Sequence, residues 1–171
     1  DYYGVADNEF GWWRIEGGKV NFDYYGIAEN EYGWWKIEGG KVNFDYTGLA
    51  DSDNGRMYVS NGGVDFGYTN VIQDGDVWVY VENGKVRYDY TGIRENANGW
   101  WKIESGIVNF KFTGIASNEN GEFYIKDGKV DFDYSGTINQ SDCIYTVKSG
   151  WVVSKEGISG IIKGVDVSHH N

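Results

Sequence analysis

The sequence has no proline, a single cysteine and few basic residues. One cysteine excludes an internal disulfide framework. No apolar run approaches the roughly 20 residues of a membrane-spanning helix, so membrane insertion is not expected. The 15 Lys and Arg residues against 26 Asp and Glu residues give a formal net charge of −11. This balance disfavours nucleic acid and anionic membrane surfaces as partners, and it suits neutral sugars or cationic groups.

Aromatic residues (18%) and glycines (26 of 171 residues) are abundant, a mixture typical of short strands joined by tight turns. The motif Asp-Tyr-Tyr-Gly at residues 1–4 returns, with variations, every 22 residues. It marks seven repeats that begin at residues 1, 23, 45, 67, 89, 111 and 133. A short fixed period predicts stacked units, each resting on its neighbours. The chain starts partway through a repeat, so we expect the natural protein to continue upstream.

Numbering the repeat from 1 to 22, position 18 is glycine in all seven copies, and position 17 is Gly, Asn, Ser or Asp. Such pairs favour a two-residue hairpin turn, in which position 16 faces 19 and position 15 faces 20. In the second repeat this places Glu38 opposite Lys41 and Ile37 opposite Val42. Positions 13, 15, 20 and 22 then share an inner face, with the aromatic residue of position 2 also in the core. Positions 3–11 are expected to form a loop anchored by an apolar position 5. The predicted fold is all-β, a β-solenoid of stacked two-stranded hairpins.

Position 12 differs from the core positions because it accepts Arg56 and Glu122 as well as tryptophan. The predicted register turns it outward, and exposed, regularly spaced tryptophans suggest a ligand-binding face. Packing between adjacent repeats or on lysine stems is the alternative. The candidate ligand-binding residues are Trp12, Trp34, Trp78, Trp100, Phe10, Tyr32 and Tyr80.

Other candidate chemistry is sparse. The acidic stretches 51–54 and 74–76 match no calcium-loop spacing, so neither a metal nor another cofactor is expected. Cys143 is most simply a small buried residue of the degenerate last repeat.

The patterns Tyr-Thr-Gly, Gly-Trp-Trp and Gly-Lys-Val resemble the choline-binding and glucan-binding repeats of Gram-positive surface proteins, over residues 1 to about 154. This resemblance implies a solenoid whose aromatic residues enclose a choline headgroup or stack on sugars. The residue after the position-4 glycine is aliphatic, as at Ile27 and Ile93, where the choline-binding family usually has tryptophan. Choline-bearing teichoic acid, a glycan strand and another polysaccharide therefore all stay open as ligands.

The tail IIKGVDVSHHN, residues 161–171, resembles the first strand of family 25 glycoside hydrolases, the Chalaropsis-type lysozymes. By this resemblance Asp166 corresponds to an active-site aspartate. The reaction needs a further carboxylate as general acid, and none follows. We therefore divide the chain into an array at 1–154 and a linker with a truncated hydrolase start at 155–171, and we expect no enzymatic activity from it.

These observations predict a secreted or cell-surface, non-catalytic module that binds a cell-wall glycan or teichoic acid and targets a C-terminal peptidoglycan hydrolase to the wall. A structural spacer or adhesin stalk without a ligand site is the alternative. Uncapped solenoid ends also invite homodimerisation.

Overall fold

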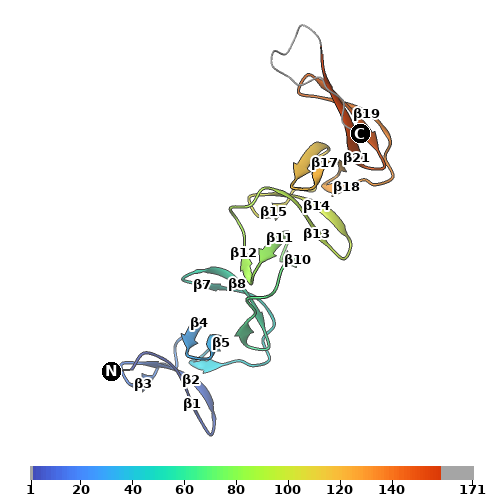
Figure 1. Ribbon diagram of the computed structural model, residues 1–171. Coiled ribbons are helices and arrows are strands. Elements are labelled where there is room, and N and C mark those ends of the chain that lie inside the picture. The colour runs from blue at the N-terminus through green and yellow to red at the C-terminus, as the bar shows by residue number, and fades with distance from the viewer. Residues whose placement is uncertain (1, 159–171) are drawn as a thin grey trace. The chain divides into compact units, whose positions relative to one another are not determined.

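The computed structural model describes residues 2–158, which form twenty-one β-strands, three in each repeat (Figure 1). Within that range no helix is long and apolar enough to cross a membrane. The chain divides into an N-terminal unit, residues 1–70 and 81–87, and a C-terminal unit that contains residues 71–80 and continues from residue 88. Each unit is a stack of hairpins that advances by one repeat every 22 residues, which confirms the predicted all-β solenoid class.

The strands fall into three classes by their place in the repeat. The first strands are β1 (Gly4–Asn8), β4 (Gly26–Asn30), β7 (Gly48–Ser52), β10 (Asn70–Asp74), β13 (Gly92–Asn96), β16 (Gly114–Asn118) and β19 (Gly136–Gln140). The middle strands are β2 (Gly11–Glu16), β5 (Gly33–Glu38), β8 (Gly55–Ser60), β11 (Val77–Glu82), β14 (Gly99–Glu104), β17 (Gly121–Lys126) and β20 (Cys143–Lys148). The last strands are β3 (Lys19–Val20), β6 (Lys41–Val42), β9 (Gly63–Val64), β12 (Lys85–Val86), β15 (Ile107–Val108), β18 (Lys129–Val130) and β21 (Trp151–Gly157).

The first strand corrects the prediction of a loop at positions 3–11. In repeat 2, β4 pairs antiparallel with β5 from Gly26 opposite Ile37 to Asn30 opposite Gly33. The Asn30 side-chain oxygen accepts the backbone N–H of Tyr32 at 2.9 Å and closes the turn between them. Gly, Asn, Glu and Ala have low strand propensity, and for that reason the sequence suggested a loop. Pairing with the middle strand outweighs this propensity.

The second hairpin is as predicted. Glu38 lies opposite Lys41 and Ile37 opposite Val42. In every copy, positions 17 and 18 both have positive φ, for example 49° at Asn61 and 84° at Gly62. This is the two-residue turn that Asn-Gly sequences favour.

Successive repeats join edge to edge through the same glycine. The backbone N–H of position 14 donates to the carbonyl of position 18 in the next repeat, as from Lys36 to Gly62 at 2.8 Å. A Cβ on Gly62 would lie 2.7 Å from the Asn43 carbonyl oxygen and 2.8 Å from the Phe44 Cα of the preceding repeat. Positive φ favours glycine at position 18 in every copy, and this close approach adds a second reason at joints such as that of Gly62.

The core consists of small clusters that each draw on two repeats. One combines Ile27 of repeat 2 with Ala50, Met57 and Val59 of repeat 3. Position 22 was predicted to lie in this core, and that prediction is wrong: Phe44 is 43% exposed, and the other position-22 aromatics are also exposed. The last strand has only two residues in repeats 1 to 6, so the chain has already left the sheet at position 22.

The final repeat ends later than predicted. Strand β21 pairs with β20 as far as Gly157 opposite Cys143, so residues 155–157 continue the array past the expected boundary at 154. Cys143 is buried, as expected. Asp166 and the hydrolase-like tail lie outside the described residues.

Candidate ligand-binding site

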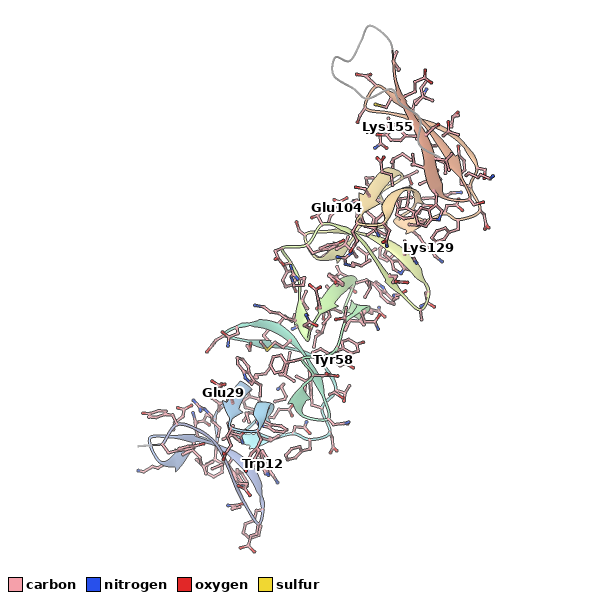
Figure 2. All side chains as sticks on the ribbon, in the orientation of Figure 1. Trp12, Glu29, Tyr58, Glu104, Lys129 and Lys155 are labelled. Carbon is pink, nitrogen blue, oxygen red and sulfur yellow. The ribbon has the colours of Figure 1, made fainter. Side chains whose placement is uncertain are left out.

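The position-12 tryptophans are half-buried between repeats, so the prediction of exposed, outward-facing indoles is wrong. Trp12, labelled in Figure 2, packs edge-on against Trp35 of the next repeat with ring centroids 4.9 Å apart. Trp100 meets Phe123 of its next repeat in the same way at 5.3 Å. The alternative, packing between adjacent repeats, therefore describes these side chains. Position 12 of one repeat reaches position 13 of the next because the two repeats are joined edge to edge.

In the C-terminal unit this packing leaves a cleft of about 190 Å³. Its aromatic walls are Trp78 of repeat 4 and Trp101 and Phe110 of repeat 5, and Asn98 and Val108 complete the lining. The rings of Trp101 and Phe110 lie 5.8 Å apart at an interplanar angle of 70°. Three aromatic residues from two consecutive repeats thus surround one small apolar space.

Hydrogen bonds hold Trp101 in place. Its indole N–H donates to the Asn96 side-chain oxygen at 2.8 Å, and the Asn96 amide donates to the Val71 carbonyl of the preceding repeat at 2.9 Å. The Lys129 ammonium of repeat 6 lies 5.4 Å from the Trp101 ring centroid, within the range of a cation–π contact. The Trp101 ring is therefore fixed before any ligand arrives.

The N-terminal unit repeats this aromatic set around Trp12. The ring of Phe44 lies 5.7 Å from Trp12 and 5.9 Å from Trp35, and Tyr32 lies 6.1 Å from Trp12. The Trp35 indole N–H again donates to an asparagine, Asn30, at 2.8 Å. This junction thus combines two tryptophans with a phenylalanine, as the cleft of the C-terminal unit does.

The remaining candidate tryptophans have different surroundings. Trp34 lies 5.9 Å from Phe66, and the position-13 residue at this junction is Met57. Trp100 contacts Phe123, which in turn packs against Trp151 at 4.4 Å. The Trp34 junction therefore lacks a second tryptophan, whereas Trp100 lies 6.3 Å from Trp151 and 5.5 Å from Phe132.

The other predicted site residues separate into two groups. Phe10 and Tyr32 are 70% and 73% exposed at the tips of the first hairpins. Tyr80 is only 3% exposed, so the prediction that its side chain faces outward is wrong. It packs against Tyr90 of the next repeat, with centroids 5.1 Å apart, and accepts a hydrogen bond from Arg94 at 3.2 Å. Burial raises the pKa of the Tyr90 hydroxyl, and the nearby Arg94 guanidinium opposes that rise.

The sequence interpretation missed Trp101 and Phe110, along with their counterparts Trp35 and Phe44, because it assigned positions 13 and 22 to the core. The recurring Gly-Trp-Trp motif was the available signal. Adjacent strand residues point to opposite faces, so two neighbouring tryptophans cannot both enter one core.

The cleft favours particular ligands. Aromatic faces attract cations, and a cation with an apolar surface also gains by leaving water in such a site. Sugar rings with apolar faces stack on the same side chains. No group of three or more potential metal ligands occurs among the described residues.

The model of the choline-binding repeat matches the chain in six consecutive segments: residues 1–21, 23–43, 45–65, 67–87, 89–109 and 111–131. No curated protein matches the chain. Among solved structures, choline-binding protein F from Streptococcus pneumoniae is similar at 18% identity, with a TM-score of 0.36. That match covers 93% of this chain, which spans 54% of the matched one. Because six repeats in a row match over more than half of its length, the chain belongs to the choline-binding repeat family.

Proposed function

We propose that the chain is a non-catalytic cell-wall-binding module that holds quaternary ammonium groups, such as the choline of teichoic acids, between consecutive repeats. The observation that carries this proposal is the cleft between Trp78, Trp101 and Phe110. A trimethylammonium group has no N–H donor, so aromatic faces suit it better than hydrogen-bonding residues. The aromatic set around Trp12 and Trp35 is the second site of this kind.

Such sites act together. A ring that contacts a cation contributes about 0.5–2 kcal/mol, so a single cleft binds weakly. A wall polymer carries many copies of its substituent, and a second contact on the same array becomes intramolecular. The module therefore needs few sites to remain on the wall.

The proposal extends to the whole protein. The hydrolase-like tail suggests that the array holds a C-terminal peptidoglycan hydrolase at the wall, outside the cell or on its surface. The chain alone should then bind purified Gram-positive walls without lowering the turbidity of a wall suspension. Binding should disappear when Trp12, Trp34, Trp78 and Trp100 are all replaced by alanine in a variant that keeps its circular dichroism spectrum.

Choline titration tests the cleft itself. Trp78→Leu keeps an apolar side chain but removes one aromatic face, so choline affinity at this cleft should fall roughly 2- to 30-fold. Trp151→Leu is the matched control, because Trp151 is a partly exposed tryptophan of the same unit outside the cleft. Equal choline affinities in the two variants would contradict the proposal that choline binds in this cleft. Binding of a wall glycan that carries no choline would indicate that the cleft binds sugars.

The spacer alternative has one observation in its favour. The tryptophans of position 12 pack between repeats, so a stalk without any ligand would also have a use for them. A module that binds neither choline nor purified walls would support that reading.

The same edge-to-edge joint would let a second copy add to an open end, and light scattering at rising concentration would detect such a dimer.

A further inference from the structure

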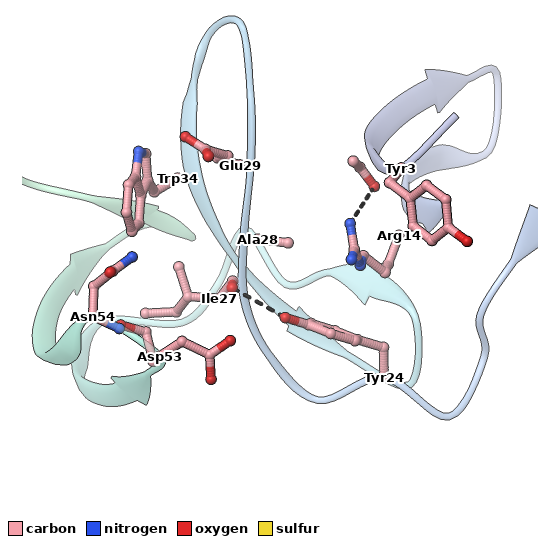
Figure 3. Close-up of a pocket in the computed structure, with 11 residues that line it drawn as sticks. Tyr3, Arg14, Tyr24, Ile27, Ala28, Glu29, Trp34, Asp53 and Asn54 are labelled. Carbon is pink, nitrogen blue, oxygen red and sulfur yellow. Dashed lines mark hydrogen bonds between the residues drawn. The ribbon is translucent and has the colours of Figure 1, made fainter. Parts of the chain in front are cut away.

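A separate groove of about 280 Å³ lies over the first hairpin of repeat 2, within the N-terminal unit (Figure 3). Ala28 lies in the middle of it. Glu29, Asp53 and Trp34 stand at one end, and Arg14 stands at the other. The groove shares none of its lining residues with the cleft around Trp78.

The corresponding groove three repeats later, in the C-terminal unit, is occupied by the protein itself. Position 6 is Arg94 there, where repeat 2 has Ala28. The Arg94 guanidinium donates to both carboxylate oxygens of Glu119, at 2.7 and 3.0 Å, and to the Tyr80 hydroxyl at 3.2 Å. Its Cζ lies 4.3 Å from the Tyr90 ring centroid. A guanidinium group thus fills this place with a carboxylate and two aromatic rings around it.

The two grooves correspond position by position. Glu119 is position 9 of the following repeat, and Asp53 is its counterpart. Tyr90 is position 2, with Tyr24 as its counterpart. Tyr80 is position 14 of the preceding repeat, and its counterpart is Arg14. The groove of repeat 2 therefore keeps the carboxylate and the position-2 tyrosine, has Arg14 in place of the second tyrosine, and has Ala28 in place of the enclosed arginine.

Arg14 does not take that place. Its Nε lies 3.3 Å from a Glu16 carboxylate oxygen, and its NH1 group donates to the Gly4 carbonyl at 3.3 Å. Its Cζ lies 5.0 Å from the Tyr24 ring centroid. Arg14 thus already has an anionic partner and stands at the end of the groove away from Asp53 (Figure 3).

We propose that the groove at Ala28 binds a guanidinium group of a partner molecule, with Asp53 in the role that Glu119 has toward Arg94. Glu29 supplies a second carboxylate, and Trp34 supplies an aromatic wall. A guanidinium group fits better than a quaternary ammonium group because its N–H donors match carboxylate oxygens in pairs. This inference does not depend on the proposed choline site.

Titration with N-acetylarginine amide, followed by the indole N–H resonances of an isotope-labelled chain, tests the proposal. The Trp34 resonance should shift and saturate at roughly millimolar probe concentrations, since exposed ion pairs are weak. Ala28→Arg, which places the internal arginine of repeat 5 in repeat 2, should abolish the shift. Asp53→Asn should also abolish it, and this variant keeps the test valid if Ala28→Arg fails to fold.

Two further variants make the result specific. Arg94→Ala should open the groove in the C-terminal unit and give the Trp100 resonance a new response to the probe. Glu31→Gln removes one exposed negative charge outside the groove and should leave the Trp34 shift unchanged. An unresponsive Trp34, or an equal shift in the Asp53→Asn variant, would overturn the proposal. Tighter binding of acetyl-Gly-Arg-Gly amide than of the single amino acid would identify the source as a polypeptide.

Choline serves as the independent arm of the experiment. It should move the Trp101 resonance in the wild type and in Ala28→Arg alike, because that cleft lies elsewhere. If only the choline response is missing, the proposed choline site is wrong and the guanidinium site stands. If only the arginine response is missing, the proposed guanidinium site is wrong and the choline site stands.

Discussion

Replacing Gly62 by alanine tests how the repeats are joined. Gly62 has φ of 84°, and a residue with a Cβ pays about 1–2 kcal/mol in this left-handed region. The new methyl group would also lie within 2.8 Å of the backbone of Asn43 and Phe44. The joint must then open by several tenths of an ångström, which weakens the hydrogen bond from Lys36 to Gly62, worth about 0.5–1.5 kcal/mol net. We expect the free energy of unfolding to fall by about 1.5–3.5 kcal/mol in total.

Gly18 provides the matched control. Its φ is 81°, so alanine meets the same backbone strain there, but nothing lies within 4 Å of the added Cβ. Gly18→Ala should therefore lower the free energy of unfolding by only about 1–2 kcal/mol, the effect of placing alanine in the left-handed conformation. The difference between the two variants isolates the contact between repeats.

Urea unfolding followed by circular dichroism and tryptophan fluorescence measures both variants. In a repeat array a weakened joint also lowers the coupling between neighbouring repeats. Gly62→Ala should therefore broaden the unfolding transition, or make the transitions followed by circular dichroism and by fluorescence fall at different urea concentrations. Equal losses in the two variants, with equally sharp transitions, would refute the argument that position 18 must be glycine because repeats approach so closely.

Three further predictions concern single contacts. The hydrogen bond from Arg94 lowers the pKa of Glu119 from its ordinary value of 4.5. The pair therefore stabilises the fold above about pH 4.5, and this stabilisation is lost as the pH falls through the lowered pKa. Glu119→Gln should remove this dependence, so its stability, measured by thermal unfolding, should fall less at acid pH than that of the wild type. Thr91→Val removes the acceptor of the Ser105 backbone N–H, a bond of 3.0 Å, and should lower the free energy of unfolding in urea by about 0.5–1.5 kcal/mol. Cys143 is 4% exposed, so a thiol reagent should modify it much more slowly in the native chain than in urea; equal rates would contradict its burial.

The turn chemistry made much of the fold predictable. Asn61 and Gly62 need positive φ at both positions, and this requirement alone fixed the register of the second hairpin. The first hairpin was not predictable in the same way. Its strand contains Gly26, Ala28 and Asn30, which have little preference for strands and become extended only because the middle strand pairs with them.

The site was harder to predict than the fold because it exists only between repeats. A single repeat shows that Trp100 and Trp101 point to opposite faces, but not that each meets a different neighbour. Trp78 closes a cleft with Trp101, which lies 23 residues further along the chain. To find such a site, one must know how each repeat is positioned against the next. The hydrogen bonds between strand edges determine that position, and the residue pattern does not reveal it. The burial of Tyr80 was missed for the same reason.

The cleft has a mechanical consequence. Its walls belong to two consecutive repeats, so pulling the ends of the array apart must separate Trp78 from Trp101 and release whatever the cleft holds. A ligand present at 100 times its dissociation constant would add about 2.7 kcal/mol to the work of parting that joint. A joint whose cleft holds a ligand should therefore resist separation more than the same joint with an empty cleft.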